Sequence, residues 1–382
     1  MKLLRGTVWR TLLSLATLLP LSLALPATAA QAADVFTVYM SASGSDSNDG
    51  MTPTTSVYSL VRVQQVLQAQ KPTTDVEVRI ATGTYSAPPM QDWRFYVPGH
   101  TISFLPVGWN VGDPAPVAGR PIMQNKKNAS GVYPDGYWFQ PKLPSDPADP
   151  LYNGGDSGLR FYYLQVQYYG AGGISIWGDS ERDVDDENYN PPMYQQAGAG
   201  LNGNTMYGML FTHLGSKWAG GHYGWGAVVL TNSSNNVMDN NLFIDIENGG
   251  SYGGYIHGAY ITHFSSDNTV TNSKFRLISS DPVKVRDRSN DNTIEHNQFI
   301  NAGVNSYYRG EFCDQACAID NPGTERQCAE YHNRFFYNDL VSGYSGGAIP
   351  TWSLSPSGLT NAGGDPCSIP AGEQRLNTGG NT

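Results

Sequence analysis

The segment "DPVKVRDRSNDN", residues 281–292, carries three basic side chains at alternate positions, Lys284, Arg286 and Arg288. Alternate residues of an extended strand point to the same face, so the three cations could share one surface. Arginine binds a carboxylate through two parallel hydrogen bonds. A lysine crowded by other cations has a lowered pKa and can act as a base. In a chain of net charge −10, this pattern predicts a local site for an anionic ligand.

A recurring asparagine motif predicts the elements that carry these cations. The pattern Asn-x-φ-x-x-x-x-φ, with φ apolar or aromatic, begins at Asn204, Asn236, Asn268, Asn292 and Asn333, each time shortly after an apolar segment such as "GAYITHFSS". We expect a single-stranded parallel β-helix, an all-β fold in which the shortest interval is one complete coil and the asparagines hydrogen-bond along the stack. A β-sandwich, the competing fold, would not keep one anchor in phase at unequal intervals.

Equal offsets from the anchor asparagine identify residues that stack on neighbouring coils. Tyr260, Lys284 and Tyr308 share one offset on successive coils, and Thr262 and Arg286 share another. The residues between them are aliphatic and belong to the core, so these positions are predicted to point outward. The result is an outward column of two tyrosines and a lysine beside an arginine.

The same counting extends the alignment to other coils. It gives Val228 and Leu230 as the equivalents of Tyr260 and Thr262 on the preceding coil. It also aligns Trp225, His257 and Asp281 on three successive coils, which predicts a hydrogen bond from His257 to Asp281.

A cationic face between aromatic rings suits an anionic sugar polymer, because arginine pairs with a carboxylate and tyrosine stacks on sugar rings. Cleavage of a uronate polymer by β-elimination needs a cation for the carboxylate, a base for the C5 proton and an acid for the leaving oxygen. We assign Arg286 or Arg288 to the first role and Lys284 to the second, with Tyr260, Tyr308 or His263 as the acid. The flanking residues expected to contact substrate are listed here: Tyr308, His257, Asp281, Asp287, Glu311 and Trp225.

The stretch "VYMSASGSDSNDGMTPTTSVYSLVRVQQVL", residues 38–67, resembles the N-terminal segment of secreted right-handed parallel β-helix proteins of the pectate-lyase-like superfamily. In that superfamily a Gly-Ser-Asp-x-x-Asp-Gly turn leads to a short amphipathic helix that caps the first coil. The resemblance implies one β-helix domain over residues 33–382, with the N-terminal strand and capping helix within residues 33–75.

Among the lyases of this superfamily, the chondroitinase-B and alginate-lyase type carries a Lys-Ser-x-x-Asn motif whose lysine is the base. The segment "RSNDN" is similar to that motif but has Arg288 in the lysine position. The resemblance therefore leaves the base to Lys284, one strand repeat upstream.

Two other functions fit the same fold. A glycoside hydrolase needs a pair of carboxyl groups, and Asp281, Asp287 and Glu311 are available, although nearby arginines favour their ionised forms. A non-catalytic carbohydrate-binding solenoid needs no catalytic residues. In that case the three basic side chains would form ordinary surface ion pairs.

The first residues predict export. Residues 1–32 combine basic residues, a run of roughly 15 apolar residues and a small-residue stretch, which is typical of a signal peptide and too short for a membrane span. The mature protein is expected outside the cell, where Cys313, Cys317, Cys328 and Cys367 would form disulfides in and around a loop at residues 310–330.

The remaining charges narrow the choice of ligands. With 33 Asp and Glu against 23 Lys and Arg, a nucleic-acid partner is excluded, and we expect a monomer acting on a polysaccharide. The acidic loop that contains Asp183, Asp185 and Asp186 could bind Ca²⁺ through carboxylate oxygens or could be simply solvated.

Overall fold

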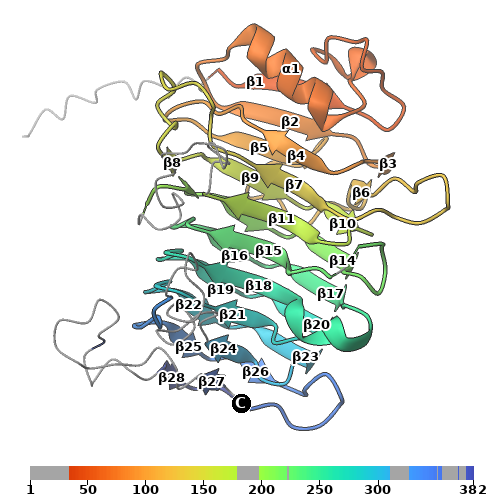
Figure 1. The fold of residues 1–382 in the computed structure, drawn as a ribbon. Coiled ribbons are helices and arrows are strands. Elements are labelled where there is room, and N and C mark those ends of the chain that lie inside the picture. Colours follow the sequence, from red (N-terminus) through yellow and green to blue (C-terminus); the bar gives the residue numbers. More distant parts are fainter. Residues whose placement is uncertain are drawn as a thin grey trace, which may run out of the picture. The chain divides into compact units, whose positions relative to one another are not determined.

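A computed structural model gives the fold of residues 34–178, 198–221, 223–309, 327–350, 352–354, 369 and 376–382 (Figure 1). Residues 34–382 cluster as one compact unit. The predicted signal peptide and the acidic loop lie outside the described residues, as do Glu311 and three of the four cysteines.

Parallel strands form three long sheets and one short sheet in the part of the chain that the structure describes. The first sheet has the order β1 (Phe36–Met40), β2 (Val76–Ile80), β5 (Ile102–Pro106), β9 (Leu159–Tyr162), β13 (Thr205–Tyr207), β16 (Val237–Asp239), β19 (Thr269–Thr271), β22 (Thr293–Glu295), β25 (Arg334–Phe336) and β28 (Asn377–Gly379). The second has the order β3 (Thr84–Ser86), β6 (Ile122–Gln124), β10 (Gln165–Gln167), β14 (Leu210–Leu214), β17 (Leu242–Ile246), β20 (Lys274–Ile278), β23 (Gln298–Ala302) and β26 (Asp339–Leu340). The third has the order β4 (Met90–Trp93), β7 (Tyr137–Pro141), β11 (Gly172–Trp177), β15 (Gly226–Thr231), β18 (His257–Thr262), β21 (Val283–Val285), β24 (Tyr307–Arg309) and β27 (Trp352–Leu354).

Consecutive coils contribute one strand to each long sheet, so every sheet neighbour is a strand of the coil before or after. The short sheet pairs β8 (Gly155–Asp156) with β12 (Leu201–Asn202). This arrangement confirms the predicted parallel β-helix.

Buried asparagines hold successive coils in register, as the motif predicts. The side-chain Oδ1 of Asn236, Asn268, Asn292 and Asn333 accepts hydrogen bonds from the backbone N–H and the Nδ2 of the preceding anchor. The paired anchors are 32, 32, 24 and 41 residues apart. Each amide therefore satisfies buried polar groups that lack a partner in their own coil.

The apolar positions of the motif build the core. Phe211, Phe243, Phe275 and Phe299 are fully buried and stack on one another, with ring centroids 5.3, 4.5 and 5.0 Å apart. Such regular stacking requires every coil to bring its phenylalanine to the same place, which explains why the motif keeps its phase while the loops vary in length.

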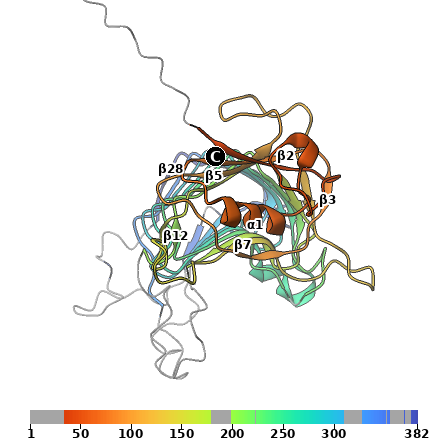
Figure 2. The same cartoon turned by 90° about the horizontal axis from the view of Figure 1, so that it is seen from above.

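Helix α1 (Leu60–Gln70) caps the first coil, as the N-terminal segment predicts (Figure 2). Its buried face consists of Leu60, Val63, Val66 and Leu67. Asp46, in the Gly-Ser-Asp turn, accepts hydrogen bonds from the N–H groups of residues 58 and 59 and from the Ser59 hydroxyl. The turn thereby fixes the entry to α1. The 3₁₀ turns are η1 (Pro53–Thr55) and η3 (Gly250–Tyr255).

No helix among the described residues is long and apolar enough to cross a membrane.

One coil departs from the predicted register. Val229, not Val228, pairs with Tyr260, and Thr231, not Leu230, pairs with Thr262. The link from β15 to Asn236 is one residue shorter than the link from β18 to Asn268, so counting back from the asparagine moves this strand by one position. Val228 and Leu230 are consequently core residues with no exposed surface.

Candidate active site

The predicted column on the third sheet is present. Tyr260 on β18 pairs with Lys284 on β21, and Lys284 pairs with Tyr308 on β24. The residues on either side of Tyr260 and Lys284 on these strands are fully buried in the hydrophobic core, whereas Tyr260 is not part of that core cluster. Tyr260 and Lys284 therefore lie on the outer face of the sheet. The side chain of Tyr308 lies outside the described part of the structure.

The side chains of Lys284 and Arg286 both lie near the aromatic ring of Tyr260. Lys284 Nζ lies 5.7 Å and Arg286 Cζ 5.4 Å from its centroid, both within cation–π range. Only 5% of Tyr260 is exposed. This burial raises its pKa, although the charge of Arg286 acts in the opposite direction. Tyr260 is therefore a neutral phenol at physiological pH and can donate a proton.

Lys284 has the properties of a base. Burial, followed by repulsion from Arg286, lowers its pKa to about 8, while Asp281 acts in the opposite direction. The sequence predicted the direction of this shift but attributed it to two arginines. Burial is the larger cause, and Arg286 is the arginine that contributes.

His263 connects Arg286 to a buried carboxylate. The Nδ1 of His263 lies 2.7 Å from Oδ2 of Asp287, whose side chain is fully buried, and its Nε2 lies 3.1 Å from Arg286 Nη2. An ionised carboxylate can only accept a hydrogen bond, and a guanidinium can only donate one. The imidazole of His263 must therefore donate from Nδ1–H to Asp287 and accept from Arg286 at Nε2. Burial lowers the pKa of His263 even though Asp287 acts to raise it, which agrees with this neutral tautomer.

Arg288 does not continue the cationic strip as predicted. The strand ends at Val285, and Asp287 and Arg288 take left-handed φ angles of 48° and 55°, so the backbone turns after Arg286. Arg288 Nη1 donates to Asp287 Oδ1 over 2.9 Å, and its guanidinium lies 5.0 Å from the Phe264 ring centroid. Asp287 also accepts from the N–H of Cys328, so it is a buried acceptor and not a surface contact for substrate.

The predicted hydrogen bond between His257 and Asp281 is present, and it is made to the backbone of Asp281. His257 Nδ1 lies 2.6 Å from the backbone oxygen of Asp281, while Asp281 Oδ1 accepts from Asn305. Burial lowers the pKa of His257 and raises that of Asp281. Trp225 is not level with His257, because β15 pairs Gly226 with His257.

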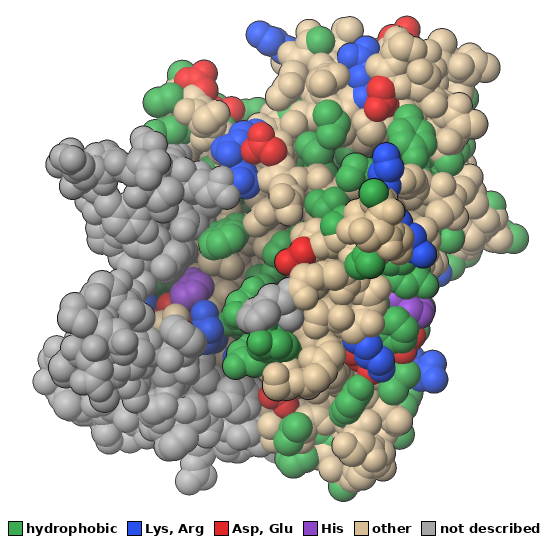
Figure 3. Space-filling view, turned by 45° about the vertical axis from the view of Figure 1, so that its right-hand side comes forward, with side chains coloured by type: hydrophobic (Ala, Val, Ile, Leu, Met, Phe, Trp, Pro, Cys, Tyr) green, Lys and Arg blue, Asp and Glu red, His purple; other side chains and the backbone are tan. Residues whose placement is uncertain are grey.

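A pocket of about 370 Å³ opens on this face. Arg286, His263 and Tyr260 form one part of its wall, and Trp177 and Trp225, each 38% exposed, form another. The remaining lining residues are Tyr137, Ser175, Val229, Thr231 and Thr262. Figure 3 shows histidine and basic side chains next to each other in a hollow of the surface.

Sequence reasoning missed two lining residues from the upstream coils, Tyr137 and Ser175. Tyr137 and Ser175 come from β7 and β11, which precede the first recognised asparagine anchor. The alternation within "GGISIW", which places Ser175 and Trp177 on the same face, is the signal that could have found them.

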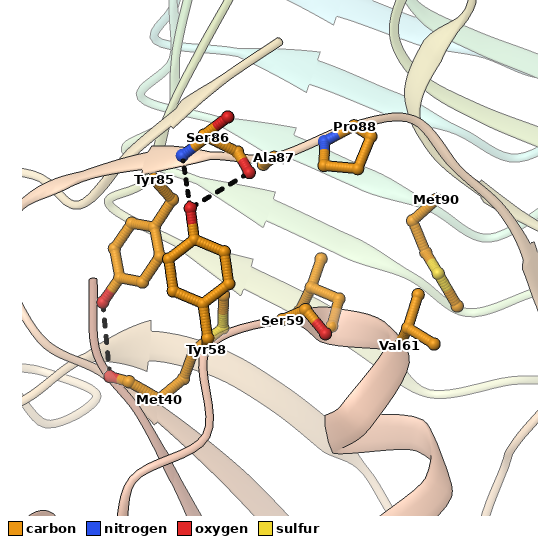
Figure 4. A pocket seen from close by; sticks show the side chains of 10 residues that line it. Met40, Tyr58, Ser59, Val61, Tyr85, Ser86, Ala87, Pro88 and Met90 are labelled. Carbon is orange, nitrogen blue, oxygen red and sulfur yellow. Dashed lines mark hydrogen bonds between the residues drawn. The ribbon is translucent and has the colours of Figure 1, made fainter. Parts of the chain in front are cut away.

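A second hollow lies beside α1 and carries no comparable chemistry (Figure 4). Its wall is largely apolar, with Met40, Val61 and Met90 among the lining residues. The hydroxyl of Tyr58 is already occupied, because it donates to the backbone oxygen of Ser86 and accepts from the N–H of the same residue.

Several predicted residues fall outside the described part of the chain. These are Glu311, the proposed calcium ligands Asp183, Asp185 and Asp186, and the cysteines Cys313, Cys317 and Cys367. Cys328 is buried and disulfide-bonded. Its partner is not among the described residues, so the predicted pairing stays a prediction. The described residues contain no cluster of acidic, histidine or cysteine side chains suited to a metal ion.

Comparison with known families agrees with this architecture. Residues 151–326, which include all the described site residues except Tyr137, match the family model described as a right handed beta helix region. The fold is a right-handed parallel β-helix. This confirms the fold that the N-terminal segment of the sequence implied.

Solved structures with a similar course of the chain include several carbohydrate-active enzymes. A rhamnogalacturonan lyase shares 15% identity over 80% of this chain and 68% of its own, with a TM-score of 0.43. A pectate lyase shares 11% identity over 91% and 77%, with a TM-score of 0.48. An alginate lyase from a Paenibacillus strain shares 12% identity over 84% and 96%, with a TM-score of 0.40. Likenesses of this degree carry no information about activity. No curated protein sequence matches this chain.

Proposed function

We propose that this protein cleaves a uronate-containing polysaccharide by β-elimination. The observation that carries the proposal is the convergence of Lys284 and Arg286 on the ring of Tyr260, beside the pocket that Tyr260 and Arg286 line. Each of these groups has the protonation state that one step of the elimination needs: a lysine that is partly neutral near pH 8, a permanent cation and a neutral phenol.

The reaction is divided among these three side chains. Arg286 pairs with the uronate carboxylate and stabilises the negative charge that develops on it. Neutral Lys284 takes the C5 proton. The electron pair forms the C4–C5 double bond and expels the C4 oxygen, which receives the proton of Tyr260. The product pair is an unsaturated uronate and a new sugar hydroxyl, and no water is consumed.

His263 is a positioning residue in this scheme. It takes no proton from the substrate, because its Nε2 accepts from Arg286 and its Nδ1–H is held by Asp287. Asp287 thus fixes the tautomer of His263, and the Nε2 of that tautomer holds the guanidinium of Arg286 in place. This role replaces the proton donor that the sequence suggested for His263.

Hydrolysis on the same scaffold is less well supported. Both oxygens of Asp287 accept hydrogen bonds from His263, Arg288 and the N–H of Cys328. Asp281 accepts from Asn305. A hydrolase needs two carboxyl groups that face the sugar, and the described carboxylates of the site are engaged within the protein.

Product absorbance tests the proposal. Purified protein is incubated with alginate, polygalacturonate, glucuronan and hyaluronan, and the ultraviolet absorbance of the conjugated double bond is followed together with reducing ends. We expect both signals to rise together on at least one polymer, and Lys284→Ala to lower the rate by about 10²–10⁴-fold. Lys274→Ala, which removes an exposed lysine from the second sheet, is the matched control and should leave the rate unchanged.

The other outcomes point to other functions. Reducing ends without unsaturated product would indicate a hydrolase. Binding without turnover, unchanged in Lys284→Ala, would indicate a carbohydrate-binding solenoid.

Export through a signal peptide at residues 1–32 belongs to the same proposal, because polysaccharides of this kind are met outside the cell. N-terminal sequencing of protein recovered from the culture medium tests it, and a mature chain that still begins at Met1 would contradict it.

A further inference from the structure

We infer that the pocket binds a uronate next to a neutral sugar, so that the substrate alternates acidic and neutral units. This inference rests on the proposed function and adds the substrate class. It follows from how charge is distributed along the stack of coils in the third sheet.

Across the third sheet, one row of residues that pair from strand to strand has a cation at one end and an indole at the other. Trp177 on β11 pairs with Thr231 on β15, and Thr231 pairs with Thr262 on β18. Arg286 continues this row, since its N–H donates to the oxygen of Ile261 on β18. Three strand spacings separate Trp177 from Arg286, which is roughly 14 Å. The pocket is thus longer than one sugar ring.

A second row of paired residues, two positions earlier on each strand, also has its positive charge at the β21 end. Ser175 pairs with Val229, Val229 with Tyr260 and Tyr260 with Lys284. Positive charge therefore lies over β21, whereas β15 and β11 present hydroxyl, aliphatic and aromatic groups. Among the described residues of these two rows, a carboxylate finds a cation at the β21 end alone.

At the aromatic end of the pocket, neighbouring aromatic rings hold the side chain of Trp225 in place. Trp225 is 38% exposed, and its ring packs edge to face against Tyr223 at 4.9 Å and Tyr255 at 6.2 Å. Tyr223 in turn stacks on Tyr252 at 5.2 Å, a residue of η3. An exposed indole held by other rings offers its face to a ligand at little entropic cost.

The distribution of charge in the pocket disfavours a substrate that carries a carboxylate on the neighbouring ring as well. Among the described residues that line it, Arg286 is the one Lys or Arg side chain. A polymer with a carboxylate on every ring would place an anion beside the indole rings of Trp177 and Trp225, where no described lining residue offers it a cation. A neutral ring can stack there instead.

Two polymers of glucuronate test this directly. Polyglucuronate carries a carboxylate on every unit, whereas hyaluronan alternates glucuronate with N-acetylglucosamine. We expect kcat/KM for hyaluronan to exceed that for polyglucuronate by at least about tenfold. Binding of oligosaccharides of both polymers to the Lys284→Ala variant, which leaves them intact, should show the same preference.

Variants at the aromatic end provide the second arm. Trp177→Ala and Trp225→Ala should each lower kcat/KM on hyaluronan by roughly tenfold and change that on polyglucuronate less. Tyr337→Ala, which removes an exposed ring from the loop after β25, is the matched control and should change neither. Circular dichroism establishes that each variant is folded.

The failures are distinguishable. Equal cleavage and equal binding of the two polymers, or an unchanged preference in both tryptophan variants, would overturn this inference and leave the proposed elimination intact. Absence of unsaturated product from every polymer would overturn both.

Discussion

At the scale of single residues, burial gives the cations of this site their chemistry. Lys284 has a pKa of about 8 chiefly because it is buried, and burial also raises the pKa of Tyr260. Counting charges along a strand cannot supply this information, since the sequence shows which residues are neighbours but not how much water reaches them. The sequence therefore predicted that Tyr260 and Lys284 are neighbours and the direction of the Lys284 pKa shift, but not the main cause of that shift.

The pH dependence of the reaction follows from the lowered pKa of Lys284. A base must be neutral, and the neutral fraction of Lys284 rises as pH rises through about 8. We therefore expect kcat/KM to increase with pH and to level off above that value, because this parameter reports the free enzyme. Initial rates over a pH series measure it. A profile that is flat or falls between neutral pH and pH 9 would contradict Lys284 as the base.

The link between His263 and Arg286 gives a second prediction at this scale. His263→Ala removes the acceptor that holds the guanidinium, so we expect KM for a uronate polymer to rise about tenfold or more, with a smaller change in kcat. Steady-state kinetics separate the two parameters. His213→Ala is the control, because His213 is also partly buried beside a carboxylate, that of Asp245 at 3.9 Å, but lies on the second sheet. Equal effects of the two substitutions would contradict the positioning role.

At the scale of strands and coils, the asparagine anchors made the site predictable. Where the link from strand to asparagine had constant length, as for Asn268 and Asn292, the predicted neighbours Tyr260 and Lys284 are neighbours in the structure. Where the link lost a residue, before Asn236, the prediction was wrong by one position. The turn that redirects Arg288 was equally invisible, since left-handed φ angles at Asp287 and Arg288 leave no mark in the residue pattern.

The ladder itself predicts a stability effect. Asn268→Ala removes the Oδ1 that accepts from the N–H and the Nδ2 of Asn236. Each buried donor left without a partner costs about 1–3 kcal/mol, so for two donors we expect the free energy of unfolding to fall by about 2–6 kcal/mol. Denaturant titration measures it. Asn377→Ala, at an exposed asparagine, should change it by less than about 0.5 kcal/mol, and an equally small effect of Asn268→Ala would contradict a structural role for the ladder.

At the scale of the whole molecule, the β-helix was predicted from a repeat that occupies only the second half of the chain. The upstream coils lack the asparagine motif, so counting from an anchor could not place Tyr137 or the pairing of Trp177, although the alternation within "GGISIW" indicates the shared face of Ser175 and Trp177. Stacking nevertheless brings those coils to the same face as Lys284 and Arg286. The pocket therefore joins a predicted cationic end to an aromatic end of which Trp225 was predicted to contact substrate.

The mass of the products tests the central claim most directly. Elimination breaks the chain without adding water, so the native protein acting on a uronate polysaccharide should release oligosaccharides whose new non-reducing ends are one water lighter than those of hydrolysis. Mass spectrometry distinguishes the two. Unsaturated ends on the products would support the roles of Lys284, Arg286 and Tyr260, whereas fully hydrated ends, or no cleavage of any uronate polymer, would contradict them.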